Sequence, residues 1–448
     1  MNQTQPDESR LSTVEQQDQP KRGSTALAGG VGTLIEGYDF SMYGYMSVFL
    51  ASVFFVGDNR FLSLMITLTI FAASYAVRPL GGIVFGHVGD RVSRRTSLLI
   101  SLLLMGGSSF VIGLLPTYAT VGIAAPLLLL ALRLVQGFSV GGEVAGATTM
   151  VSETAGPRRQ GFFGSLNPLG ATLGFALASG VSALVTAFTT AEQMLAWGWR
   201  IPFLVAGPLA VLCFILRRRL IDPRPPEKSA ESAPKRLPII DVIRQLPAEV
   251  ALGAGLSIAM NGTAYFGLTF VSIHMIENVG YSSSTAFGVT TLVIAISALL
   301  MPIAGLLADR IGLMQLAIVG CVGYAVLSFV GIGMINSGSV ALAFIGFMVY
   351  MINTSALQVA VYAGSPSLFP SHLRFTGMAL GYNIGVAIAG GFAPVVSLWL
   401  AERFGSLAPA GFPVVISLIG IACAVTVIVR RRSGKSQGLA SPAATAIV

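Results

Sequence analysis

The sequence has 448 residues, of which 54% are hydrophobic and only 10% are charged. Soluble domains carry charge at about a quarter of their positions, so this composition excludes an ordinary soluble protein and indicates a chain that lies in a lipid bilayer. The polar remainder is too short for a separate nucleotide-hydrolysing domain. The net charge of +8 does not indicate a nucleic-acid partner, because Lys and Arg gather in the cytoplasmic loops of membrane proteins.

The predicted elements begin after a polar stretch, residues 1–26, which lacks the charged start and short apolar core of a cleavable signal peptide. We expect this stretch to be a disordered cytoplasmic tail. Twelve apolar runs follow, and each has the about 20 residues that a membrane-spanning helix needs. They lie near residues 28–56, 62–86, 97–115, 121–152, 161–188, 200–219, 249–275, 284–307, 313–336, 338–368, 375–401 and 411–430. The sequence therefore predicts an all-α membrane protein with twelve transmembrane helices.

The twelve predicted helices divide into two groups of six. The stretch 220–248, rich in Pro and basic residues, is predicted to be a cytoplasmic linker between bundles at 27–219 and 249–430, with a tail at 431–448. Gly86-His-Val-Gly-Asp90-Arg91 after the second run resembles Gly305-Leu-Leu-Ala-Asp309-Arg310 after the eighth. Arg158 and Gly161 correspond to Arg374 and Gly377 at nearly the same spacing. Two such markers indicate a duplicated six-helix unit, which in secondary transporters encloses a site near the middle of the membrane.

The basic residues predict the orientation. With a cytoplasmic N-terminus, the N-terminal tail, the linker, the C-terminal tail and the loops on the same side hold most of the Lys and Arg, as the positive-inside rule requires. We therefore expect a monomeric multi-pass protein of the plasma membrane with both termini in the cytoplasm. Cys213, Cys321 and Cys423 stand alone in apolar runs, which indicates packing residues and no metal or cofactor.

Five ionisable residues fall inside the predicted spans: Glu36, Asp39, Arg78, Arg133 and Glu143. A charge at the bilayer centre costs at least about 2.5 kcal/mol, so such residues face a cavity or a partner. A helical rise of about 1.5 Å per residue places Asp39 and Arg133 near the middle of the membrane and the other three nearer the cytoplasm. A carboxylate stays ionised beside an arginine and takes up a proton when left alone in apolar surroundings. We predict that Asp39, with Arg133 and Glu36, couples transport to protons; a permanent structural pair is the alternative.

The substrate is predicted to meet Arg133 or Arg78 and polar side chains within the spans. These side chains are Tyr38, Asn167, Asn261, Tyr265, Asn353, Gln358, Tyr382 and Asn383. Asn and Gln in lipid also hold helices together, so a packing role stays open for them. If each arginine is engaged with a carboxylate, none is spare for a second or third substrate carboxylate, and burying an unpaired charge is expensive. The charge count therefore favours a monocarboxylate or a zwitterion over a tricarboxylate.

The loop Gly86-His-Val-Gly-Asp90-Arg91-Val-Ser-Arg-Arg95-Thr resembles the signature of the major facilitator superfamily. Gly37-Tyr38-Asp39-Phe40, Arg78-Pro-Leu-Gly-Gly, Arg133-Leu-Val-Gln136-Gly137 and Trp197-Gly-Trp-Arg-Ile-Pro-Phe look like its metabolite:proton symporter branch. Gly37 and Thr33 depart from the Trp and Asn usual there.

The resemblance implies two pseudo-symmetric six-helix bundles, the major facilitator fold, with loops that hold the cytoplasmic helix ends together in the outward-facing state. The gating residues that it implies are Asp90, Arg91, Arg95, Glu153, Arg158, Asp309 and Arg374. The alternative is that these charges only anchor the topology.

The function expected from these features is proton-coupled symport of a small organic acid or zwitterion, such as a betaine or proline, with protons and lipid as the other partners. The sequence has no Walker loop and no His-Glu-x-x-His, which excludes ATP-driven pumping and argues against an enzyme. The alternatives are an antiporter that exports a drug or metabolic product and a membrane sensor that does not transport.

Overall fold

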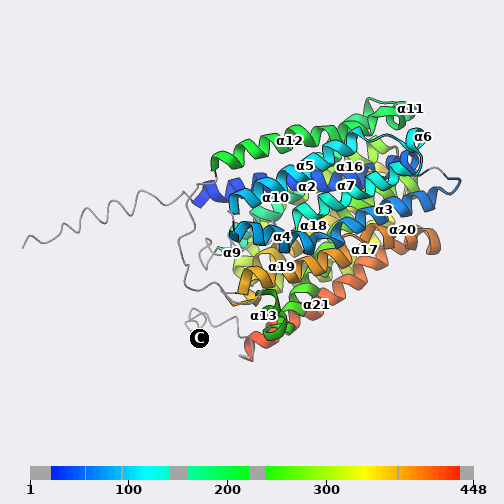
Figure 1. The fold of residues 1–448 in the computed structure, drawn as a ribbon. Helices are drawn as coiled ribbons and strands as arrows, with labels where there is room; N and C mark the ends of the chain where they lie inside the picture. The colour runs from blue at the N-terminus through cyan, green and yellow to red at the C-terminus, as the bar shows by residue number, and fades with distance from the viewer. Residues whose placement is uncertain are drawn as a thin grey trace, which may run out of the picture.

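The structure, a computed structural model, describes residues 22–55, 57–91, 94–141, 159–220, 238–370 and 373–433. Within these ranges the chain is helical and has no β-strand. The long helices lie side by side in one bundle (Figure 1). We call the end where α2 (Arg22–Phe54) begins and α21 (Gly411–Arg432) ends the inner end. The opposite end, with the short helices α6 (Tyr118–Val121) and α11 (Ala191–Gln193), is the outer end.

The other helices fall into two sets along the chain. The first-half helices are α3 (Arg60–Ala76), α4 (Arg78–Arg91), α5 (Arg94–Leu114), α7 (Ala124–Val140), α9 (Gln160–Gly164), α10 (Leu166–Ala187), η1 (Met194–Gly198) and α12 (Arg200–Leu220). The second-half helices are α13 (Pro238–Gln245), α14 (Pro247–Tyr265), η2 (Phe266–Phe270), α15 (Val271–His274), η3 (Met275–Val279), α16 (Ser283–Ile311), α17 (Leu313–Ile335), α18 (Val340–Gly364), η4 (Ser365–Leu368), α19 (Arg374–Gly385), η6 (Val386–Gly390), α20 (Ala393–Phe404) and η7 (Ala408–Ala410).

The helices account for the twelve predicted spans. In the described ranges, nine segments are long and apolar enough to cross a membrane, and the bent pair Ala191–Gly198 and Arg200–Ile215 makes a tenth. α2, with 33 residues, and α7, with 17, lie where the first and fourth spans were expected. The helical form follows from the apolar composition, because a backbone in lipid must satisfy its own hydrogen bonds. The predicted all-α, twelve-helix fold is confirmed.

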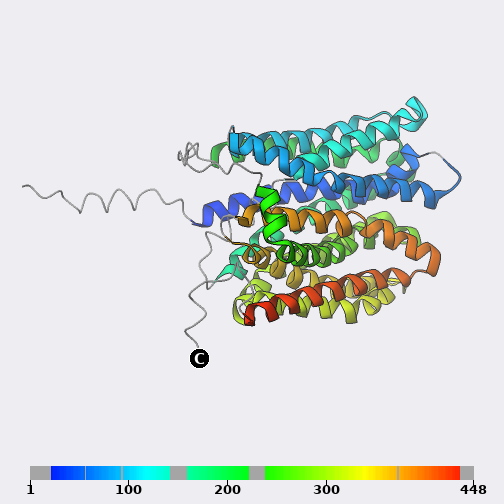
Figure 2. The same ribbon diagram turned by 60° about the horizontal axis from the view of Figure 1, so that its bottom comes forward.

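The two sets of helices form two halves that pack against each other. In Figure 2 the blue and cyan helices occupy the upper part of the view and the yellow and red helices the lower part. α10 packs against α16 across the interface, and α3 packs against α20. α13 lies within the stretch predicted as a linker, a helix that the sequence analysis did not anticipate.

Helix ends follow local sequence rules. The side chains of Asn59, Ser282 and Ser339 accept hydrogen bonds from backbone amides in the first turns of α3, α16 and α18, as N-cap residues do. Gly280 ends η3 with φ 87° and Gly312 ends α16 with φ 100°, conformations that glycine adopts without a steric penalty. These ends fix where each span stops.

Glycines bring two pairs of first-half helices into close contact. A Cβ atom on Gly137 would lie 1.9 Å from the carbonyl oxygen of Ser74, so the backbones of α7 and α3 touch there. A Cβ on Gly37 would lie 2.2 Å from the carbonyl oxygen of Ala171, which packs α2 against α10. Small residues permit such approach between membrane helices. A larger side chain such as Trp would not fit at Gly37 in this packing.

Candidate functional site

A cavity of about 50 Å³ lies between the two halves. The first half contributes Thr33, Glu36, Gly37, Phe40, Arg78, Asn167, Ala171, Thr172 and Phe175 to its lining. The second half contributes Met260, Asn261, Ala264, Tyr265, Leu268, Gln358, Tyr362 and Tyr382. Thr172 donates a hydrogen bond of 3.3 Å to Oε1 of Gln358, which ties the two halves together beside the cavity. We call this space the central cavity.

Among the described residues, the lining of the central cavity contains one arginine and one carboxylate. Arg78 of α4 is 3% exposed, and its guanidinium carbon lies 4.0 Å from the ring centre of Phe40 and 4.4 Å from that of Tyr75. Glu36 of α2 is 8% exposed. Nε of Arg78 is buried without a hydrogen-bond partner among the described residues. A buried donor left without an acceptor is costly, so Arg78 is suited to bind an anionic group in the cavity.

Aromatic rings form much of the remaining wall. The ring centres of Phe175 and Tyr265 are 5.7 Å apart at 75°. Those of Tyr362 and Tyr382 are 5.9 Å apart, and their hydroxyl oxygens are 3.2 Å apart. The rings come from α10, α14, α18 and α19, so both halves contribute to this wall.

A second polar group lies behind the central cavity and contains Asp39 and Arg133. Nε2 of Gln136 donates to Oδ2 of Asp39 and to Oγ of Ser109, the latter at 2.7 Å. Nη1 of Arg133 donates to Oε1 of Gln136, and Nη2 donates to Oγ of Ser74 at 3.0 Å. Gln136 therefore bridges the two charged side chains, which form no direct ion pair in the described part of the chain. We call these five residues the Asp39 network.

The Asp39 network is shut off from the cavity. Asp39 is 2% exposed and Arg133 is fully buried. The Arg133 guanidinium carbon lies 4.3 Å from the ring centre of Tyr43 and 5.0 Å from that of Phe40. Within the described ranges, Oδ1 of Asp39 has no hydrogen-bond partner. A buried, charged carboxylate oxygen without a hydrogen-bond partner destabilises the protein. A proton on Asp39 would remove that charge and so reduce the destabilisation.

The predicted substrate contacts separate into two sets. Arg78, Asn167, Asn261, Tyr265, Gln358 and Tyr382 line the central cavity. Tyr38, Arg133, Asn353 and Asn383 do not. Their polar groups bind elsewhere: the Tyr38 hydroxyl donates to the carbonyl of Pro202, Nδ2 of Asn353 donates to the carbonyls of Val349 and Tyr350, and Nδ2 of Asn383 donates to the carbonyl of Gly141.

Three residues of this region were not predicted as functional: Gln136, Phe175 and Tyr362. Each follows another polar position on its helix by three or four residues, which puts the two on one face. Gln136 follows Arg133 and Tyr362 follows Gln358. This spacing could have indicated that these residues face the site. It could not distinguish Phe175 from a core residue, because aromatic residues are common in helix packing.

Most predicted gating residues lie outside what the structure describes. The side chains of Asp90, Arg91 and Arg95, and all of Glu153 and Arg158, fall there. Glu143, which was predicted as a charge inside a span, also falls outside the described residues. Nε of Arg374 is buried without a hydrogen-bond partner among the described residues.

Asp309 crosses between the halves at the inner end. Its Oδ1 accepts a hydrogen bond from the amide of Gly161 at 2.6 Å, and its Oδ2 accepts one from the amide of Phe162 at 3.1 Å. A carboxylate at the first turn of a helix is favoured by the amides exposed there. A Cβ on Gly161 would lie 2.4 Å from the carbonyl oxygen of Gly305, so α9 and α16 touch at this point. This contact joins the two halves at the inner end.

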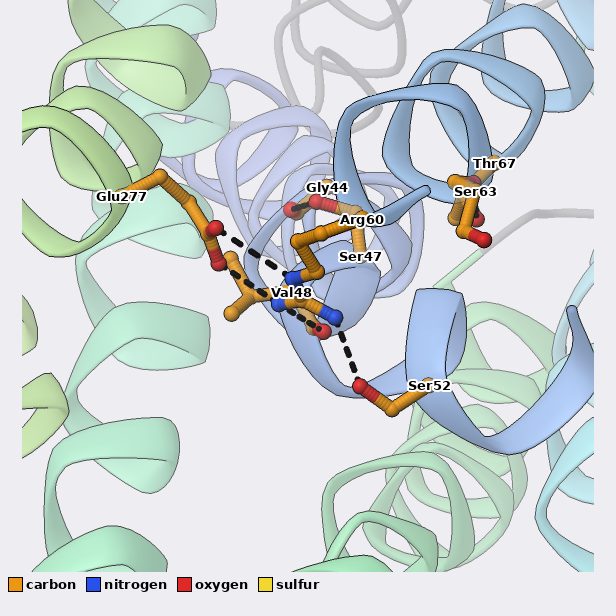
Figure 3. Close-up of polar contacts among 8 residues, drawn as sticks. All are labelled: Gly44, Ser47, Val48, Ser52, Arg60, Ser63, Thr67 and Glu277. Carbon is orange, nitrogen blue, oxygen red and sulfur yellow. Dashed lines mark hydrogen bonds and ion pairs between the residues drawn. The ribbon is translucent and has the colours of Figure 1, made fainter. Parts of the chain in front are cut away.

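An ion pair joins the halves at the outer end (Figure 3). Nη2 of Arg60 lies 2.6 Å from Oε1 of Glu277, and Nε lies 3.3 Å from Oε2. The same guanidinium donates to Oγ of Ser52 at 2.6 Å and to the carbonyl of Val48 at 2.8 Å. Arg60 thus fastens the last turns of α2 to η3 of the other half. The central cavity therefore lies between two contacts that join the halves, one near each end of the bundle.

Comparisons with known proteins identify the family. The sequence profile described as Major Facilitator Superfamily matches residues 29–381. An ectoine/proline transporter of Corynebacterium glutamicum is 37% identical over 405 residues, which are 86% of this chain and 80% of that protein. A proline/betaine transporter of Escherichia coli is 32% identical over 442 residues, 96% of this chain and 88% of that one.

A xylose transporter of E. coli, solved in a partially occluded inward-open conformation, has the same fold with a TM-score of 0.69 at 19% identity, covering 91% of this chain and 97% of that one. The relatives are transporters and not enzymes, as the sequence predicted. The chain is a multi-pass membrane transporter that belongs to the Major Facilitator Superfamily.

Proposed function

We propose that this transporter carries a small zwitterionic osmolyte together with a proton by alternating access. The observation that supports the substrate class is the charge of the central cavity, which has one arginine and one carboxylate, Arg78 and Glu36, in its lining. A zwitterion complements that pair, whereas a tricarboxylate would bury charges without partners. The relatives named for proline, betaine and ectoine transport agree with this class.

Arg78 is the group we propose for the substrate carboxylate, in place of the Arg133 that the sequence favoured. Arg78 lines the cavity and has a donor to offer. Arg133 is enclosed by rings and by its bonds to Gln136 and Ser74. A guanidinium binds a carboxylate with two parallel hydrogen bonds, which fixes the orientation of the ligand.

Asp39 is the proton carrier in this proposal. A buried carboxylate with one unpartnered oxygen is stabilised by protonation, and protonation weakens its acceptance of the Gln136 amide. The Gln136 amide is also bonded to Arg133, which holds Ser74 of α3. Ser74 near the end of α3 lies four residues before Arg78, the first residue of α4. A change in the Asp39 network can therefore reach the substrate carboxylate site through the junction of these two helices.

We propose inward transport across the plasma membrane by a monomer, with the inner end in the cytoplasm. Three arginines, Arg430, Arg431 and Arg432, close α21 at the inner end, as the positive-inside rule favours. The Asp309 contact then closes the cytoplasmic side and the Arg60–Glu277 pair closes the outside.

The test is uptake by the purified protein in proteoliposomes. With an inward proton gradient, labelled glycine betaine or proline should accumulate above its external concentration, a protonophore should abolish the accumulation, and citrate should compete poorly. Saturable uptake of no zwitterion, or stronger competition by citrate than by any betaine, would overturn the substrate class. Accumulation driven only by an outward proton gradient would instead establish an antiporter.

A further inference from the structure

The aromatic wall of the central cavity lies in the same lining as the Glu36 carboxylate. We propose, on the basis of the zwitterion transport proposed above, that Glu36 and the rings of Phe175, Tyr265 and Tyr362 form a cation subsite. This subsite would select zwitterions whose cationic nitrogen carries alkyl groups. All four side chains line the cavity and keep between 5% and 8% of their surface exposed.

Ring occupancy decides which aromatic residues can serve. The faces of Phe40 and Tyr75 already lie against the Arg78 guanidinium, at 4.0 and 4.4 Å from its central carbon. A substrate cation placed there would meet a like charge. The rings of Phe175 and Tyr265 stand 5.7 Å apart at 75°, so together they form two walls of a corner. Tyr265 also packs on Tyr75, with ring centres 5.3 Å apart at 85°, so the cation belongs at the Phe175 side of this corner and the carboxylate at Arg78.

The chemistry of the corner favours an alkylated nitrogen. An aromatic face attracts a cation through its ring quadrupole, and quaternary ammonium groups are recognised in this way. A primary ammonium has three donors and needs as many acceptors. The faces of Phe175, Tyr265 and Tyr362 offer such donors no lone pair, so an ammonium placed against them would leave donors without acceptors. Glu36 supplies the negative charge, while the rings contact methyl or methylene groups that make no hydrogen bonds.

The subsite also joins the two halves. Phe175 and Glu36 belong to the first half, and Tyr265 and Tyr362 belong to the second. A cation held among them contacts both halves at once, whereas Arg78 binds the carboxylate from the first half alone. Recognition of the cationic end is therefore the step that favours closure of one half on the other.

The experiment measures discrimination between two ligands of the same shape. Glycine betaine and 3,3-dimethylbutanoate share a carboxylate and a trimethyl head and differ in the charge of the central atom. Both compete against labelled proline in counterflow by the full-length protein in proteoliposomes without a proton gradient, so coupling does not enter. The readout is the ratio of their half-inhibitory concentrations for the wild type, Glu36→Gln, Tyr265→Leu and Tyr265→Phe.

We expect the wild type to favour the betaine by at least about tenfold. Glu36→Gln and Tyr265→Leu should each lower that ratio severalfold, while Tyr265→Phe, which keeps the ring, should retain most of it. Phe287→Leu removes a buried ring that packs on Tyr45 outside the cavity and should leave the ratio unchanged. Unchanged ratios in both Glu36→Gln and Tyr265→Leu would overturn the subsite. No inhibition of the wild type by any zwitterion would instead contradict the proposed function itself.

Discussion

The Arg60–Glu277 pair gives a quantitative prediction about the outer closure. Glu277→Gln removes the charge of the partner and leaves the bonds of Arg60 to Ser52 and Val48, which lie in its own half. The side chains of Arg60 and Glu277 are 42% and 19% exposed. Ion pairs with this much exposure contribute about 0.2 to 1 kcal/mol. The variant should therefore favour the outward-open state by up to about fivefold.

The assay is the rate at which an impermeant thiol reagent, added outside, modifies a cysteine in the central cavity. Met260→Cys provides that cysteine in a chain whose three native cysteines, Cys213, Cys321 and Cys423, are replaced. Labelling should be faster in Glu277→Gln by a factor of a few. The exchange of charges, Arg60→Glu with Glu277→Arg, should bring the rate back toward the wild-type value.

A matched control is Glu192→Gln at the outer end. The Glu192 carboxylate accepts a hydrogen bond of 2.8 Å from Thr190 in its own half, so its loss should leave the labelling rate unchanged. Equal labelling of the wild type and Glu277→Gln would refute the outer closure. So would faster labelling that the charge exchange does not reverse, because then the effect would not come from attraction between these two side chains.

Three further predictions concern other parts of the molecule. Asp39→Asn should abolish proton-driven accumulation in proteoliposomes while substrate exchange without a gradient persists; full accumulation would remove Asp39 from the coupling role. Asp309→Ala loses two hydrogen bonds that backbone amides donate to a charged acceptor, worth about 1.5 to 3 kcal/mol each. The maximal rate of transport should therefore fall at least tenfold, with a smaller change in the substrate concentration at half-maximal rate. A change in that concentration at an unchanged maximal rate would argue against a gate. Gly137→Val places side-chain atoms where a Cβ alone would lie 1.9 Å from the Ser74 carbonyl, so thermal unfolding in detergent should occur at a markedly lower temperature; an unchanged midpoint would mean that α3 and α7 can separate without cost.

The fold was predictable because apolar run length is a strong signal in membrane proteins. The helical rise also predicted similar depths for Asp39 and Arg133, and both side chains are bonded to Gln136. The direction in which each side chain points around its helix axis could not be predicted, because depth along the helix does not determine which neighbouring helix a side chain faces. Tyr38 and Asp39 are successive residues, so they cannot face the same way: Asp39 contacts Gln136 of α7, while Tyr38 reaches Pro202 of α12.

The bridging role of Gln136 depends on how closely α7 approaches α2 and α3, which is set by contacts such as that of Gly137 with Ser74. Sequence spacing could place Gln136 on the same face as Arg133, but it could not show that an amide would separate two opposite charges. The choice of Arg78 over Arg133 for the substrate carboxylate could not be made from the sequence either, because helix packing determines which arginine borders the cavity.

The size of the central cavity bears on how tightly two fluxes can be coupled. A space of 50 Å³ accommodates about four water molecules, which is less than an alkylated amino acid requires. An osmolyte must therefore widen the space by displacing side chains, so the empty and the loaded cavity differ in shape. Leakage of protons without substrate depends on how unfavourable reorientation is when Asp39 carries a proton and Arg78 faces no carboxylate. That difference sets how many protons cross for each osmolyte.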